Sequence, residues 1–297
     1  RFVRVLAAVL DDGLDLVEDK LNGGVFALNE HEKTALEARP DLREFARLID
    51  GMEDETGQFS LWRRYSFRDL PVELISHVYQ LFVENSKDSV YTPPALVRLL
   101  LDEVLGEARL DRILETGEVI LDPACGSGIF LVESYKRLVN HWRSRNDWAR
   151  PGVDVLRDLI GRVRGVDRDH GAVELAAFSL CLALCDELEP EEIRRSDKLF
   201  PDLIDRTIVT SCFFSLQQSG GLPKSVGLVI GNPPFDSDLK TAGAKIAGAL
   251  YEEKHGTLPD KQVAFLFLHE GVKLLAPGGH ALPAIRFRRR QCRLDRG

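Results

Sequence analysis

The spacing of hydrophobic and polar residues divides the chain into two regions. Residues 1 to about 88 are rich in Leu, Ala, Glu, Asp and Arg, and runs such as 70–82 place apolar residues at helical spacing. From Val119 onward, short apolar runs end at Gly, Asp or Pro and are followed by longer helical stretches. We therefore predict a helical N-terminal region followed by an α/β core.

The second region resolves into individual elements of a parallel sheet. Strands are predicted at 119–121, 163–166, 207–210 and 226–230. Helices are predicted near 129–142, 171–186 and 261–275. Residues 143–161 are predicted to form an inserted loop with a short helix. Because strands and helices alternate, the sequence predicts a doubly wound parallel sheet.

Composition excludes several classes of protein. With 297 residues and 44% apolar content, the chain can build one or two domains with a real core. No apolar run approaches the ~18 to 20 residues of a membrane span, so we expect no membrane partner. The net charge of −8 excludes a polycation, so any contact with nucleic acid has to come from a local basic face.

Cysteine usage favours a reducing compartment. The five cysteines form no CxxC pair, and an odd number suits the cytoplasm better than a disulfide framework or a zinc cage. Two of them lie in an apolar helical run, where we interpret them as small buried hydrophobes. The cysteines are Cys125, Cys181, Cys185, Cys212 and Cys292.

The two ends of the chain predict a fragment. The first residue is Arg1, and residues 286–297 carry six arginines against one acid, Asp295. We expect this basic tail to be disordered or mis-specified, with a nucleic-acid arm as the alternative.

A glycine loop follows the first predicted strand. Asp122-Pro123-Ala124-Cys125-Gly126-Ser127-Gly128 lies between that strand and the next helix, where open α/β sheets bind nucleotides. A dinucleotide fingerprint would need a third glycine at Leu131, and the next strand-end acid, Asp167, lies farther on than the usual ~20 residues. NAD is therefore disfavoured, and a purely structural turn is the alternative.

Asp167 follows the second predicted strand. A carboxylate there can accept both ribose hydroxyls of a nucleoside. The alternative role, a helix N-cap, fits Asp169 better because Asp169 immediately precedes the helix predicted from Gly171.

A proline loop follows the fourth predicted strand, at Asn232-Pro233-Pro234-Phe235. The prolines restrict the backbone, so the Asn232 amide oxygen and a neighbouring carbonyl can grip the two hydrogens of an exocyclic amine while Phe235 stacks on its ring. A simple turn is the alternative reading of the same residues.

Four motifs in order resemble a known family. Tyr91-Thr92-Pro93-Pro94, the loop at 122–128, Gly-Val-Asp at 165–167 and Gly-Asn-Pro-Pro-Phe at 231–235 resemble the adenine-specific (N6) DNA methyltransferases of restriction-modification systems. Their order is similar to the gamma class, in which the catalytic core precedes the DNA-recognition domain. The resemblance covers about residues 60 to 280. It implies a Rossmann-like sheet that binds S-adenosylmethionine.

The resemblance also implies the cofactor-binding residues. The first motif would close over the methionine end, the glycine loop would line the methionine moiety, and Asp167 would take the ribose hydroxyls. The residues so implied are Tyr91, Thr92, Pro93, Asp122, Ala124, Gly126, Gly128 and Asp167.

The same resemblance implies the catalytic residues and the partners. Asn232 and the Pro233 carbonyl would hold the amine of an adenine flipped out of double-stranded DNA, with Pro234 in the loop and Phe235 on the base. Methyl transfer is then a direct in-line attack that needs no metal. A specificity or restriction subunit would be a further partner.

Two features depart from the family pattern. Cys212 stands where an acid usually contacts the cofactor's adenine, and a thiol is a poor acceptor, so affinity is expected to fall by ~1 to 2 kcal/mol. After the turn at 274–279, Pro283 argues against a central strand. We therefore expect a truncated or frame-disrupted core at 89–285, followed by the tail at 286–297 and lacking the recognition domain.

Two other functions are compatible with these motifs. A protein-glutamine or ribosomal-RNA amino methyltransferase would keep the chemistry and change the substrate. An inactive cofactor-binding remnant or subunit of a restriction-modification system would keep the fold without the reaction.

Overall fold

The computed structural model describes Thr34 and residues 92–234, 239–259 and 262–283. Thr34 lies in a helix, but the remainder of the predicted helical region at 1–88 falls outside the described residues. The basic tail at 286–297 also falls outside them. Both predictions therefore stay predictions.

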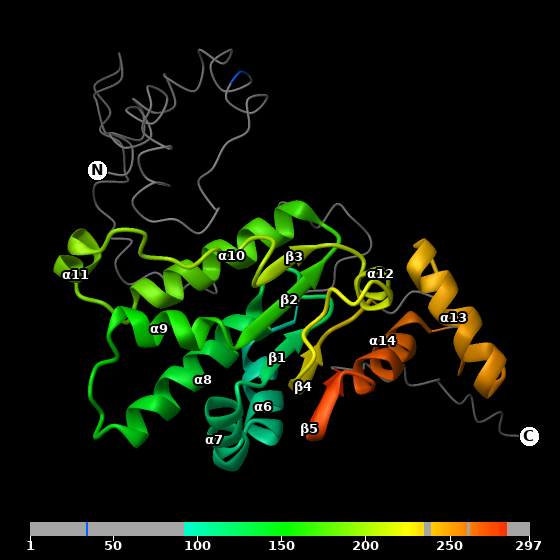
Figure 1. Cartoon of the computed structure of the whole chain (residues 1–297), viewed down its shortest axis with the longest axis horizontal. Helices are drawn as coiled ribbons and strands as arrows, with labels where there is room; N and C mark the ends of the chain where they lie inside the picture. Colours follow the sequence, from blue (N-terminus) through cyan, green and yellow to red (C-terminus); the bar gives the residue numbers. More distant parts are fainter. Residues whose placement is uncertain (1–33, 35–91, 235–238, 260–261, 284–297) are drawn as a thin grey trace, which may run out of the picture.

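A five-stranded sheet, all of whose paired neighbours run parallel, forms the centre of the described structure (Figure 1), with the strand order β3-β2-β1-β4-β5. The strands are β1 Val119–Asp122, β2 Val163–Asp167, β3 Ile208–Thr210, β4 Val226–Gly231 and β5 Leu275–Pro283. The first four coincide with the predicted strands to within one residue at either end. The order reverses between β1 and β4, and open α/β sheets bind ligands at such a reversal, outside the carboxyl ends of the strands.

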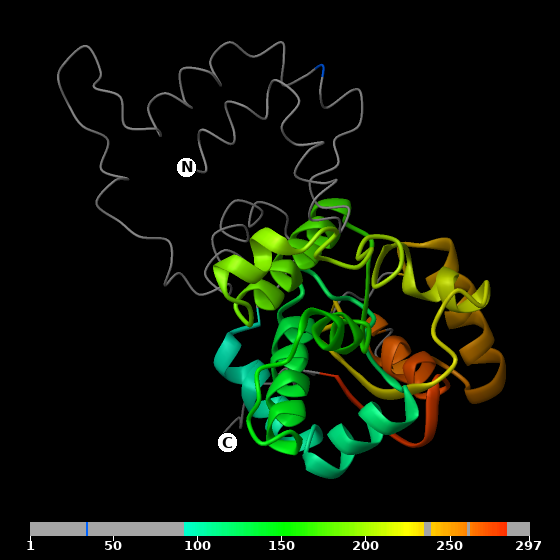
Figure 2. The same cartoon turned by 60° about the vertical axis from the view of Figure 1, so that its left-hand side comes forward.

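Helices cover both faces of this sheet (Figures 1 and 2). One face is covered by α6 Pro94–Val104, α7 Glu107–Thr116, α8 Ile129–Arg145, α9 Val153–Ile160 and α10 His170–Cys185, with α11 Pro190–Arg195 beside them. The other is covered by α12 Phe213–Gln218, α13 Ala242–His255 and α14 Val263–Val272. The architecture is therefore the predicted α/β class, with three layers.

Alternating side chains of the strands divide the core in two. In β1, Ile120 packs among α6 to α10, whereas Val119 and Leu121 pack on the opposite side with α12 to α14. All six residues of β4 are buried. A strand covered on both faces has no solvent side, which is why β1 and β4 appear in the sequence as unbroken apolar runs.

The predicted helices are confirmed as α8, α10 and α14, and the short helix expected within 143–161 is α9. Asp169 is the N-cap of α10, because its Oδ1 accepts a hydrogen bond from the Ala172 amide at 3.0 Å. The sequence analysis did not predict α6, α7, α11, α12 or α13. Of these, α11 and α12 have only six residues each, and helices this short depend on tertiary packing more than on their own propensity.

Residues 275–283 form a strand, although the sequence analysis expected no regular strand around Pro283. The pairing shifts between Val226–Leu275 and Leu228–His280, so most of the turn expected at 274–279 is an irregularity within β5. Proline is tolerated because β5 is an edge strand of the described sheet and pairs only with β4. Arg112 donates to the Pro277 carbonyl and also binds the buried carboxylate of Glu118, which fastens α7 to this strand.

None of the described helices is long and apolar enough to cross a membrane. The described cysteines are all free thiols. Cys181 on α10 is buried among apolar side chains as predicted, whereas Cys185 at the end of α10 packs against the same core but is only partly buried. Cys292 lies outside the described residues.

Candidate active site

The glycine loop between β1 and α8 has one packed side and one open side. Gly126 and Gly128 both adopt a positive φ, at 51° and 82°, a conformation that favours glycine. A Cβ on Gly128 would lie 2.8 Å from the Cβ of Ala176, so this glycine lets α8 pack closely on α10. A Cβ on Gly126 would meet nothing within 4 Å. The space beside Gly126 is therefore where a ligand could approach the backbone.

Asp167, at the end of β2, is bonded directly to this loop. Its Oδ2 accepts from the Gly126 amide at 2.8 Å, and its Oδ1 accepts from the Asp169 amide at 3.0 Å. Because a carboxylate has about four lone-pair positions, these two bonds leave acceptor capacity beside the open part of the loop. The geometry is compatible with the predicted contact to ribose hydroxyls.

Asp122 lies beneath the loop instead of on its surface. Its side chain is fully buried, its Oδ1 accepts from the Ala124 amide at 3.1 Å, and its Oδ2 has no hydrogen-bond partner. Burial, together with the nearby charge of Asp167, raises the pKa of the Asp122 carboxyl to about 8. At neutral pH this carboxyl is therefore mostly protonated.

The proline loop after β4 is packed directly against Asp122. A Cβ on Gly231 would lie 2.3 Å from Oδ1 of Asp122, so only glycine lets the two strand ends approach this closely. Asn232 follows at once and donates from Nδ2 to the Thr92 hydroxyl at 3.0 Å. Thr92 itself is only 6% exposed. Since the nitrogen of the amide is bound to Thr92, Oδ1 is the acceptor that Asn232 can present to an amine.

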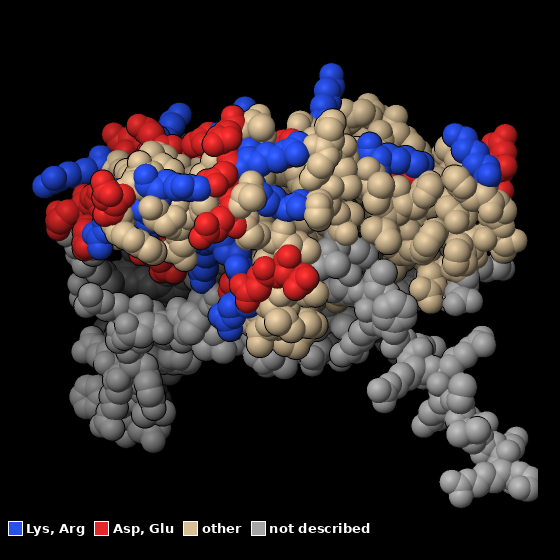
Figure 3. All heavy atoms as spheres, turned by 90° about the horizontal axis from the view of Figure 1, so that it is seen from below, with Lys and Arg blue, Asp and Glu red and all other residues tan. Residues whose placement is uncertain are grey.

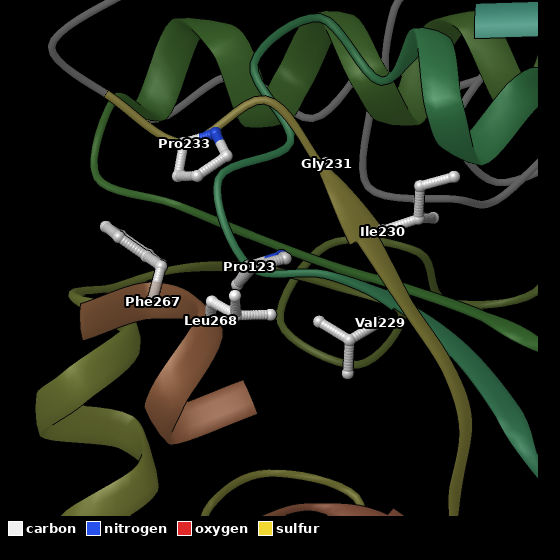
Figure 4. Close-up of a pocket in the computed structure, with 7 residues that line it drawn as sticks. All are labelled: Pro123, Val229, Ile230, Gly231, Pro233, Phe267 and Leu268. Carbon is white, nitrogen blue, oxygen red and sulfur yellow. The ribbon is translucent and has the colours of Figure 1, made fainter. Parts of the chain in front are cut away.

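An apolar pocket lies where the two loops meet α14 (Figure 4). Pro123 comes from the glycine loop, Pro233 from the proline loop, and Phe267 and Leu268 from α14. The remaining lining residues belong to the end of β4. Sequence reasoning missed Phe267, because it belongs to no motif and reaches the pocket only through the packing of α14.

Two predicted site residues, Tyr91 and Phe235, lie outside the described residues. Pro93 is exposed at the N-terminus of α6, and Pro234 is partly buried beside Pro233. Ala124 packs against the core on the α12 to α14 face. The roles assigned to these residues stay predictions.

Cys212 lies just past the end of β3, at the first turn of α12. Its Sγ is 3.0 Å from the hydroxyl oxygen of Thr241, the N-cap of α13. Burial raises the pKa of this thiol, but hydrogen bonds from Thr241 and Ser215 outweigh that effect and bring the pKa below its usual value. Cys212 thus has more thiolate character than a buried cysteine usually has.

Charged side chains of both signs mix on the face shown in Figure 3, chiefly toward the end that holds α8, α9 and α11. The end that holds α13 and α14 shows fewer charges in this view. The described residues on this face therefore do not form the continuous basic surface that a strong electrostatic contact with DNA requires.

Sequence comparison identifies the family. The model of the N-6 DNA Methylase family matches residues 73–285, which include the glycine loop, Asp167 and the proline loop. The chain belongs to this family. The predicted resemblance is thereby confirmed.

The curated relatives of this N-6 DNA methylase chain include a restriction enzyme with a methyltransferase and an adenine-specific methyltransferase. A putative type II restriction enzyme and methyltransferase of Methanocaldococcus jannaschii is 35% identical over 123 residues, covering 40% of this chain and 10% of the relative. The adenine-specific methyltransferase PglX of Streptomyces coelicolor is 25% identical over 214 residues, covering 69% of this chain and 15% of the relative. The chain thus spans a small part of these relatives.

One solved structure is a modification subunit of a putative type I restriction enzyme from Vibrio vulnificus. It is 18% identical, with a TM-score of 0.44, and the match covers 80% of this chain and 46% of that one.

Proposed function

We propose that this chain is the catalytic core of an adenine-specific DNA methyltransferase, which transfers a methyl group from S-adenosylmethionine to the exocyclic amine of a flipped adenine. The observation that carries the proposal is the close packing of Gly231 on Asp122. This packing brings the glycine loop and the Asn-Pro-Pro loop together at the carboxyl edge between β1 and β4. Family membership supports the same reaction.

The residues of the glycine loop fit a nucleoside cofactor. The space beside Gly126 is open, and Asp167 has acceptor capacity next to it. The buried, unpartnered Oδ2 of Asp122 adds negative potential beneath the loop when it ionises. When bound there, S-adenosylmethionine supplies a sulfonium methyl group as the electrophile.

The proline loop would hold the amine. Thr92 orients the amide of Asn232, so that Oδ1 and the Pro233 carbonyl are the two acceptors for the hydrogens of the amine. These contacts would aim the nitrogen lone pair at the methyl group, and positioning would supply most of the rate enhancement. The apolar surfaces of Pro233 and Phe267 would exclude water from the reacting centre.

The experiment is a pair of measurements on the whole chain. Calorimetric titration with S-adenosylmethionine should show binding that Asp167→Ala weakens strongly. Incubation of the chain with unmethylated plasmid DNA and the cofactor should then yield N6-methyldeoxyadenosine, detected by mass spectrometry of the digested DNA. Asn232→Ala should bind the cofactor normally and produce no methylated base.

Failure at either step has a distinct meaning. Absence of cofactor binding by the folded chain would favour the inactive remnant, and binding without DNA methylation would favour a subunit that needs a partner. Family membership does not favour a protein-glutamine or ribosomal-RNA substrate. The expected partners are double-stranded DNA and a specificity or restriction subunit, and the cytoplasmic location stays a prediction from the cysteine pattern.

A further inference from the structure

The carboxyl group of Asp122 is isolated from every compensating charge in the described part of the chain. It is 0% exposed, and its one hydrogen bond comes from the Ala124 amide to Oδ1. No described Lys, Arg or His forms an ion pair with it, and Oδ2 is buried without a partner. From β4, Gly231 packs so closely on Asp122 that a Cβ there would lie 2.3 Å from Oδ1, and this glycine carries no charge.

The ionisable groups that face Asp122 make a negative charge there more costly. From β2, the Asp167 carboxylate repels it. From the loop, the buried thiol of Cys125 stays neutral, because burial and the two neighbouring carboxyls raise its pKa. A carboxylate in such surroundings lowers its free energy by binding a proton, unless a cation enters the site.

We propose that Asp122 holds a proton in the ligand-free chain and releases it when a positively charged group binds between the glycine loop and Asn232. The inference rests on the proposed function, since the cationic ligand is S-adenosylmethionine. In this step the O–H bond of the Asp122 carboxyl breaks, the electron pair stays on oxygen and the proton passes to the solvent. Asp122 thereby becomes a determinant of cofactor specificity, favouring ligands that carry a positive charge at this place.

Two groups of the cofactor could supply that charge, namely the sulfonium and the α-ammonium. Both would lie near the carboxyl edge of β1 and β4 if the methyl group is to reach an amine held by Asn232. S-adenosylhomocysteine keeps the ammonium and lacks the sulfonium, so comparison of the two ligands distinguishes the sources.

The test is calorimetric titration at pH 7 in two buffers of different ionisation enthalpy, which measures protons released per ligand bound. The full chain should release up to one proton more than its Asp122→Asn variant on binding S-adenosylmethionine, because the amide has no proton to lose. Release with S-adenosylhomocysteine as well identifies the ammonium as the source, and release with S-adenosylmethionine alone identifies the sulfonium. The exposed Asp205→Asn variant, whose backbone φ of 64° asparagine tolerates, should behave like the parent chain.

Equal proton release by the parent chain and Asp122→Asn would overturn the proposal. Absence of binding would contradict the proposed function instead. In that case, the protonation of Asp122 in the ligand-free chain is measured directly. Infrared spectra of the ligand-free chain should show a protonated carboxyl band that disappears on titration with a midpoint near pH 8. The band should be missing in Asp122→Asn, and its absence from the parent chain at pH 6 would overturn the proposal whether or not the cofactor binds.

Discussion

Asn232 and Thr92 are 140 positions apart in the chain, yet the side-chain amide of Asn232 donates to the Thr92 hydroxyl across 3.0 Å. The family resemblance implies that Thr92 contacts the cofactor and that Asn232 holds the target amine. Their hydrogen bond means that the segment before α6 also orients the residue that would hold the amine. Under the proposed function, this contact would make Thr92 a positioning residue for the reaction as well as a candidate cofactor contact.

Replacement of Thr92 separates these two roles. Thr92→Val keeps the shape and removes the hydroxyl, so Asn232 loses its partner and the single-turnover methylation rate should fall about five- to tenfold, the effect of one hydrogen bond. Thr92→Ser should retain most of the rate. If Thr92→Val lowered the thermal stability and left the rate unchanged, the contact would be structural only.

The approach of Gly231 to Asp122 predicts a loss of stability on substitution. Gly231→Ala would place a Cβ 2.3 Å from Oδ1 of Asp122 and force the two strand ends apart, at a cost of about 1–3 kcal/mol in the free energy of unfolding. Gly152→Ala is the matched control, because a Cβ there meets nothing within 4 Å. Urea denaturation measures the free energy of unfolding of both variants. An unchanged urea midpoint for Gly231→Ala would contradict the packing described above.

Gly126→Ala should separate cofactor binding from packing. The added Cβ enters open space, so the main structural cost is the positive φ of 51°, about 1–2 kcal/mol. The same Cβ would fill part of the space proposed for the cofactor. We expect a chain that stays folded and binds S-adenosylmethionine at least tenfold more weakly, measured by calorimetry, whereas unchanged affinity would place the cofactor elsewhere.

Among the four described cysteines, Cys212 should react first with an alkylating reagent. Hydrogen bonds to Cys212 outweigh its burial and lower its pKa, whereas burial raises the pKa of Cys185 to about 12. Limited iodoacetamide treatment at pH 7.5 should therefore label Cys212 first, as measured by peptide mass spectrometry. Thr241→Val removes a hydrogen bond to the thiol and should slow this labelling. Preferential labelling of Cys185 would contradict the environment described for the two thiols.

Asp122 should make the folded chain less stable as the pH rises. Its pKa is about 8 in the folded chain and near 3.8 when unfolded, so the folded state keeps a proton that the unfolded state loses. The stabilising contribution of the protonated Asp122 to the free energy of unfolding is fully present below about pH 4. Above that pH it is lost at about 1.4 kcal/mol per pH unit until the pH passes about 8. Urea midpoints of the parent chain and Asp122→Asn should converge in acid and diverge toward pH 8, with the variant more stable. Parallel curves across this range would show that Asp122 is not the titrating group.

The sequence by itself determined the first four strands and three of the helices that follow them. The signal was strongest for β1 and β4, because parallel strands buried on both faces need unbroken apolar runs. It also determined the chemical character of the two loops, since glycine and proline restrict backbone conformation wherever they occur. The Asp169 cap was predictable for the same local reason. Family membership agrees with this part of the analysis.

Only the tertiary structure decided which residues of the site meet. The carboxyl of Asp122 leaves room only for glycine at position 231. Thr92 binds Asn232 although 140 positions separate them, and Phe267 of α14 lines the pocket beside the proline loop. The strand at 275–283 likewise forms despite Pro283, because the chain places it at the outer side of β4. Such contacts depend on the stacking of strands and helices distant in sequence, and the buried state of Asp122 depends on all of them at once, so no local pattern records them.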